Sequence, residues 1–217
     1  MKKATQLLLM VCIATIANAQ YYYLPFVNAG TNPGGINTDS EFPSGGGLPA
    51  GWTTLARPTA SVPVWSANQT IPFSFSFNGI PVTQFKVSSS AVLTFDVSSG
   101  IAAPAYAKAA LPNAAIPDNS VCIWGLSALG SNDNILTKTF GSAPYRQLWI
   151  HFNSYGYATA STGSLFTYWS IVLEETTNNI YVVDQRTGGY SAAQKKVSIG
   201  IQVNSSIAYS VAGSPNV

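Results

Sequence analysis

Charged residues and the side chains that usually carry out catalysis are scarce in this chain. Only 8% of its 217 residues are Asp, Glu, Lys or Arg, and it has one histidine, His151, and two cysteines. A catalytic serine or cysteine would therefore have only His151 available as its histidine base. A closed zinc site, which needs four ligands, would have too few histidines and cysteines. This composition argues against hydrolytic and zinc-dependent chemistry, and we expect no cofactor.

Disulfide bonds are not expected either. Cys12 lies in an N-terminal apolar run that we expect to be removed, which leaves Cys122 without a partner in the same chain. Cys122 stands in the apolar sequence Val-Cys-Ile-Trp, a setting typical of a buried, unreactive thiol. Stability must then come from a hydrophobic core. Residues 20–217 suffice for one, because domains above ~150 residues bury about 70% of their unfolded surface.

The N-terminus has the pattern of a secretory signal peptide. Lys2 and Lys3 precede an apolar run from Leu7 to Ile16, and Ala17-Asn18-Ala19 stands before Gln20. This order predicts a signal peptide over residues 1–19, cleaved between Ala19 and Gln20. The apolar run is only half of the ~20 residues that a membrane-spanning helix needs. We therefore expect the export machinery as a partner, no transmembrane segment, and a secreted or cell-surface location.

Without this leader the chain is formally neutral. Lys2 and Lys3 account for the whole formal net charge of +2. Neutrality argues against nucleic acid as a partner, because binding to phosphates requires clustered basic residues. Residues 20–60 include a stretch rich in Gly, Pro, Asn and Ser, which predicts an extended lead-in, and residues 61–217 are expected to form one domain.

Strand patterns dominate the rest of the sequence. Phe73, Phe75 and Phe77 alternate with serines, and Asn78-Gly79 separates them from a second apolar run over Ile80 to Val87. Alternation followed by Asn-Gly is a strong signal for a β-hairpin.

Further strands are expected along the chain, at Leu93 to Val97, Val121 to Leu126, Ile135 to Phe140, Gln147 to Asn153, Phe166 to Thr177, Ile180 to Arg186 and Val197 to Asn204. Tyr21 to Tyr23 could add an edge strand, and Ala103 to Leu111 leaves room for a helix of one or two turns between prolines. Many short strands without an amphipathic helix predict an all-β fold, a two-sheet antiparallel sandwich of jelly-roll type.

Three stretches carry a resemblance to a known family. They are IPFSFSFNG at 71–79 with VSSSAVLTF at 87–95, APYRQLWI at 143–150, and WSIVLEETTNNI at 169–180. In this order they resemble the N-terminal β-sandwich domain of large exported surface proteins of Bacteroidota, which are adhesin-like and usually type IX secretion substrates. LPAGW at 48–52 adds to the likeness.

Two departures from that family pattern are visible. Ser90-Ala91 stands where the family usually has Asn-Gly, and Tyr145 replaces its usual Asn. The resemblance implies a sandwich module whose motifs define the fold and offer no catalytic residue to carry over. The family's C-terminal sorting domain does not follow within the sequence, so we expect this chain to be the N-terminal piece of a longer protein, with a stand-alone member of the family as the alternative.

Candidate site residues are few. Four aromatic residues outside the obvious inward phases could form a stacking surface for a glycan or a surface protein, with packing as the alternative: Trp149, Tyr155, Tyr157 and Tyr168. Asp118 and Asp133 lie in Asx-rich turns with oxygen ligands of the kind that calcium takes, but without EF-hand spacing.

His151 and the two adjacent glutamates fit catalysis poorly. His151 alternates with Leu148, Ile150 and Phe152, which places it on a second or solvent-facing side of its strand. Glu174 and Glu175 are neighbours on a strand and point to opposite faces, so they cannot flank one glycosidic bond. We expect Glu175 to accept nearby backbone hydrogen bonds or to pair with Arg146 or Arg186.

The sequence thus favours a non-enzymatic exported module that works in adhesion or as a structural leading domain. A carbohydrate-binding accessory domain is the first alternative. The second is the N-terminal fragment of a larger secreted hydrolase, with its catalytic part beyond Val217.

The leader makes a direct prediction. Secreted protein should begin at Gln20, in part as pyroglutamate, because the small residues Ala17 and Ala19 fit signal peptidase. Mass spectrometry of the N-terminal peptide tests this. Intact Met1, or a lipid on Cys12, would contradict it.

Overall fold

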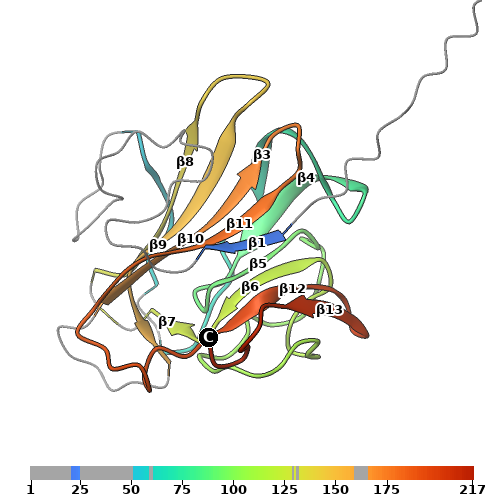
Figure 1. Ribbon diagram of the computed structural model, residues 1–217. Helices are drawn as coiled ribbons and strands as arrows, with labels where there is room; N and C mark the ends of the chain where they lie inside the picture. The colour runs from blue at the N-terminus through green and yellow to red at the C-terminus, as the bar shows by residue number, and fades with distance from the viewer. Residues whose placement is uncertain (1–20, 25–50, 59–60, 129, 131, 159–165) are drawn as a thin grey trace, which may run out of the picture.

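Two β-sheets packed face to face make up the regular structure (Figure 1). The computed structural model describes residues 21–24, 51–58, 61–128, 130, 132–158 and 166–217. These residues form thirteen strands and no helix, so none of them belongs to a helix long and apolar enough to cross a membrane. The predicted two-sheet antiparallel sandwich is confirmed. The predicted signal peptide and the predicted cleavage pair Ala19 and Gln20 lie outside the described residues.

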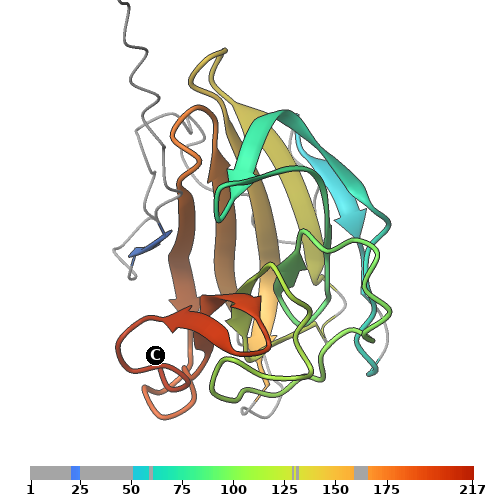
Figure 2. The ribbon, with the colours of Figure 1, turned by 90° about the vertical axis from the view of Figure 1, so that its right-hand side faces the viewer.

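The larger sheet has seven strands and contains the longest one, β9 (Gln147–Tyr157). Its order is β1 (Tyr21–Leu24), β11 (Ile180–Gly188), β10 (Phe166–Glu174), β9, β8 (Asn134–Phe140) and β2 (Thr53–Ala56), with β7 (Leu126–Ser127) paired to β9. All neighbours run antiparallel except β1, which is parallel to β11. Figure 2 shows β8 to β11 side by side.

The second sheet has six strands. Its order is β13 (Ile207–Ser210), β12 (Ser198–Asn204), β6 (Ser120–Trp124), β5 (Val92–Thr94), β4 (Ile80–Val87) and β3 (Gln69–Phe77). This order leaves β3 and β13 as its edges.

The predicted hairpin is confirmed as β3 and β4. Asn78 and Gly79 have φ of 49° and 75°, the two positive values that a tight hairpin turn of this kind requires. Phe75 and Phe77 are each 2% exposed, and their ring centroids lie 5.8 and 5.0 Å from that of Phe95. The phenylalanine face of β3 therefore forms part of the core between the sheets.

The helix left open for Ala103 to Leu111 does not form, and the segment is irregular. Its carbonyls bond side chains of the six-stranded sheet instead: the Trp124 indole donates to Ala105 O at 2.8 Å, and the Ser198 hydroxyl to Ala109 O at 2.6 Å. Helix formation would compete for these acceptors, and the flanking prolines limit it further. The segment thus packs on Trp124 at the outer face of that sheet.

Some strand ends differ from the predicted ones. β5 ends at Thr94, not at Val97, because the Thr94 hydroxyl accepts a hydrogen bond from the Asp96 amide at 3.1 Å and turns the chain. β9 continues past Asn153 to Tyr157 through Ser154, whose φ is 60°. β1 and β2 show that the described parts of the expected lead-in, residues 20–60, also contribute to a sheet.

Substitutions on the two faces of β3 should differ in their effect on the free energy of unfolding. Phe75→Ala should lower the free energy of unfolding by ~3–5 kcal/mol, since it empties a space between the sheets. Ser74 is exposed, so Ser74→Ala should change it by less than about 0.5 kcal/mol. Urea denaturation measures both, and equal effects would show that the face is assigned wrongly.

Candidate functional site

The four aromatic candidates do not form an exposed stacking surface. Trp149 and Tyr155 have no exposed area, and Tyr157 and Tyr168 are only 2% and 5% exposed. Tyr155 and Tyr157 belong to the core between the sheets, while Trp149 packs edge-on against Phe140 on the other face of its sheet. The expectation is wrong because Trp149 is buried on the outer face of its sheet, while Tyr155 and Tyr157 enter the core between the sheets.

His151 lies within a buried polar group. Its Nδ1 atom is 2.9 Å from Gln185 Oε1 and 3.0 Å from Ser170 Oγ, and all three residues are at most 1% exposed. The imidazole packs between Trp52 and Tyr168, with ring centroids 5.7 and 6.0 Å away. The prediction that His151 lies on the second face of its strand is therefore correct, and the alternative that it faces solvent is wrong.

Ser170 and Gln185 were not identified from the sequence. The Ser170 hydroxyl donates to Gln185 Oε1 at 2.6 Å, and the two residues join His151 only because β9, β10 and β11 are neighbours. A serine beside a histidine satisfies the distance for an activated nucleophile. The burial of this pair instead indicates a network that ties the three strands together.

The carboxylates near β10 are engaged in structural contacts. Arg146 forms a two-pronged ion pair with Glu175, with N···O distances of 2.7 and 2.9 Å, and its backbone amide also donates to Glu175. The guanidinium lowers the pKa of Glu175. Glu174 accepts from Thr177, Gln147, Asn179 and Tyr181. The predicted pairing of Glu175 with Arg146 is confirmed.

The calcium candidates are in different settings. Asp118 is exposed, whereas Asp133 is 5% exposed and accepts the Gly130 amide at 2.7 Å. Among the described residues, no three His, Cys, Asp or Glu side chains lie close enough together to hold a metal ion. Cys122 is fully buried, and burial raises the pKa of its thiol.

A groove lies where β3 bows away from β4. Thr70 pairs with Gln84 and Phe75 with Val82, so four residues of β3 lie opposite Thr83 alone. Residues 71–74 thus have no partner in the ladder with β4, and β3 is also the edge of its sheet. Such a bulge bends the strand and redirects its side chains.

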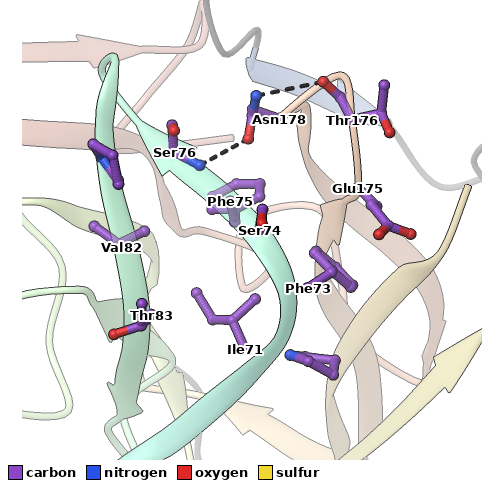
Figure 3. A pocket seen from close by; sticks show the side chains of 12 residues that line it. Ile71, Phe73, Ser74, Phe75, Ser76, Val82, Thr83, Glu175, Thr176 and Asn178 are labelled. Carbon is purple, nitrogen blue, oxygen red and sulfur yellow. Dashed lines mark hydrogen bonds between the residues drawn. The ribbon is translucent and has the colours of Figure 1, made fainter. Parts of the chain in front are cut away.

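The groove has a volume of about 690 Å³. Ile71, Phe73 and Phe75 give it a buried apolar floor, and its exposed rim carries hydroxyls and prolines from β3, β4 and the turn after β10: Pro72, Ser74, Pro81, Thr83 and Thr176. In Figure 3, Ile71, Val82 and Thr83 lie in the space beside the bowed strand, and Asn178 stands above Ser76.

The turn at the rim has an unusual backbone. Thr176 and Asn178 have φ of 69° and 55°, and positive φ is uncommon for a β-branched residue. The Thr176 hydroxyl donates to Pro144 O at 2.7 Å, and Asn178 Oδ1 accepts the Ser76 amide at 2.7 Å. Strain of about 1–3 kcal/mol per residue of this kind occurs mostly at functional sites.

An ion pair and a cation–π contact hold this turn against β3. The guanidinium of Arg146, already paired with Glu175, lies 5.4 Å from the centre of the Phe73 ring, close enough for a cation–π contact. Arg146, Glu175 and Phe73 thus connect both sheets at one end of the groove. Because the ion pair neutralises Glu175, the groove carries no net charge.

Residues 50–216 match the NIDO-related family. The chain belongs to this family. No curated protein and no solved structure matches it.

The three stretches that carry the sequence resemblance meet at the groove. The first supplies Phe73 and Ser76, the second Arg146, and the third Glu175 and Asn178. Their separation in the chain hides this arrangement, so sequence reasoning treated them only as marks of the fold.

Asp184 of β11 is a buried carboxyl group with a raised pKa. Burial raises its pKa from 3.8 to about 7, and Lys195 opposes this. Its Oδ1 atom is buried without a hydrogen-bond partner among the described residues. Catalytic carboxylic acids often have raised pKa values. Asp184, however, interacts electrostatically with Tyr23 and Tyr157, and both tyrosines pack in or against the core between the sheets.

Asp184 predicts a pH-dependent stability. Its folded pKa of about 7 exceeds its ordinary value of 3.8, so the folded state binds more protons between these values. The contribution of Asp184 to stability is therefore complete when the pH is below its ordinary pKa, and it is lost as the pH rises through its pKa in the folded state. Asp184→Asn should make the free energy of unfolding less dependent on pH across this window.

Urea denaturation at several pH values tests this prediction. Asp96→Asn is the matched control, because Asp96 lies in a surface turn bonded to Ser98. An unchanged pH profile for Asp184→Asn would show that Asp184 does not titrate in this window.

Proposed function

We propose that this chain is a non-enzymatic interaction module of an exported protein, and that the groove beside β3 is its binding surface. The observation that carries this proposal is the bowed edge strand, whose residues 71–74 have no strand partner. NIDO-related domains are generally extracellular, which agrees with the signal-peptide pattern of the sequence.

The groove suits an extended, uncharged polypeptide segment. An edge strand with free pairing capacity can accept another strand, which gains affinity from main-chain hydrogen bonds and specificity from side-chain pockets. Ile71 and Phe75 provide an apolar pocket, and the ion-paired Glu175 adds no net charge. The preferred segment therefore places an apolar side chain on this floor and small residues beside the serine-rich rim.

Carbohydrate binding is the second candidate. The hydroxyls of Ser74, Thr83 and Thr176 and the Asn178 amide line the groove and could bond sugar hydroxyls. A sugar would lack the aromatic platform that we expected, because Trp149 and Tyr168 are buried. This difference ranks a polypeptide above a glycan.

The non-enzymatic character of the chain rests on its titratable groups. His151 is buried with Ser170 and Gln185, Glu175 is paired with Arg146, and acid–base catalysis needs such groups within reach of a substrate. The finer proposal is an adhesin-like module of a Bacteroidota surface protein exported by type IX secretion. It rests on the resemblance of the three stretches alone.

Binding can be tested with residues 20–217 immobilised on a biosensor. A displayed library of random peptides should yield binders with an apolar anchor, whereas a glycan array should be blank. Ser74→Trp should weaken selected peptides about tenfold or more, equivalent to about 1.4 kcal/mol, because the indole would occupy the groove.

Ser205→Trp is the matched control, since Ser205 is exposed in the turn between β12 and β13. Equal losses in both variants would reject the groove as the binding surface, and glycan hits without peptide hits would favour the second candidate. Hydrolysis of a glycoside, ester or peptide that is abolished by His151→Ala or Glu175→Gln would reject the non-enzymatic proposal.

A further inference from the structure

The first described strand differs from all the others in its pairing. β1 is four residues long, lies at an edge of the seven-stranded sheet and runs parallel to β11, with Tyr21 opposite Ile180 and Leu24 opposite Val183. The other paired neighbours in the described chain run antiparallel. β1 therefore does not continue a hairpin of the sheet but docks on it from elsewhere in the chain.

The side chains of β1 fill both faces of the β11 edge. Tyr21 and Tyr23 pack against the core between the sheets, and the Tyr23 ring stacks on Trp169 at 6.3 Å. On the opposite face, Tyr22 stacks on Tyr181 at 5.3 Å. The same segment docked on the β11 edge of another copy could make the same aromatic contacts.

The place where β1 docks contains buried polar atoms without hydrogen-bond partners among the described residues. The Tyr21 hydroxyl and the Asp184 Oδ1 atom are buried without hydrogen-bond partners among the described residues. An unsatisfied buried polar group costs about 1–3 kcal/mol. This penalty offsets part of the stabilisation that aromatic packing and edge pairing give to the strand.

The chain between β1 and β2 is long. These strands lie at opposite edges of one sheet, about 24 Å apart at the usual strand spacing. Residues 25–50 separate Leu24 from Gly51, and this length can span up to about 90 Å. The connection does not oblige β1 to dock on its own chain.

We propose that the β11 edge is a strand-accepting site and that its occupant is the Tyr21–Leu24 strand of a second copy of this chain. Exchange keeps every contact of β1 and changes only which chain supplies it, which makes it a low-cost route to association. With the leader cleaved after Ala19, as the sequence predicts, Gln20 alone precedes this strand and β1 can enter a neighbouring copy end first. This inference does not depend on the groove beside β3.

Cross-linking between differently labelled copies tests the proposal. Tyr22 and Tyr181 are register partners, so cysteines at these positions lie at a distance that a disulfide can bridge. Mature chains carrying Tyr22→Cys alone and Tyr181→Cys alone are mixed, refolded together from urea at rising protein concentration, and oxidised. Cys122 is fully buried and should not compete.

The mixture should give a covalent heterodimer whose yield rises with concentration. The matched control pairs Tyr22→Cys with Tyr209→Cys, because Tyr209 is an exposed tyrosine on the other edge strand, β13. We expect about tenfold less product from the control, since only a docked strand raises the local thiol concentration.

Equal yields from the test and control mixtures would overturn the proposal, provided that the double variant Tyr22→Cys with Tyr181→Cys closes its disulfide within one chain. Leu24→Cys with Val183→Cys, the next pair on the same face, repeats the test should the tyrosine variants fold poorly. Light scattering on the unaltered mature chain adds an independent readout: a mass of one copy at every concentration would also reject exchange.

Discussion

The structure depends on the burial of aromatic and β-branched side chains between the two sheets. With two cysteines and few charges in the sequence, neither disulfides nor networks of ion pairs can hold the sheets together. Phe75 and Phe77 from one sheet and Ile150, Phe152 and Trp169 from the other belong to one core cluster. Apolar burial of this extent is the dominant favourable term in folding.

Burial on both faces of the large sheet creates a second requirement. Polar side chains that alternate with the core residues must find partners inside the protein. His151, Ser170 and Gln185 satisfy one another, as do Glu174 and its four donors. Hydroxyls and amides carry out this task in a chain with little charge, and Asp184 is a place where the requirement is met incompletely.

Two sites of incomplete strand pairing remain on this rigid frame. Beside β3, the need to keep Phe73, Phe75 and Phe77 inward while the strand bows leaves residues 71–74 unpaired with β4. At the β11 edge, a short parallel strand occupies a position that no hairpin neighbour fills. Both sites offer main-chain pairing to a polypeptide, and for this reason interaction is the function that we propose.

The sequence alone determined the elements governed by local patterns. Phe73 to Val87 specified its hairpin because alternation and Asn-Gly act within a few residues, and Val-Cys-Ile-Trp indicated the burial of Cys122. Only the tertiary structure decided the rest. Trp149 and Tyr168 are buried although alternation marks their side of the strand as an outer face, Tyr155 belongs to the core between the sheets, and the groove joins Phe73, Arg146 and Glu175 from three distant stretches. Such contacts depend on which strands become neighbours, and neighbouring strands are selected by the packing of the whole sandwich, not by the local order of residues.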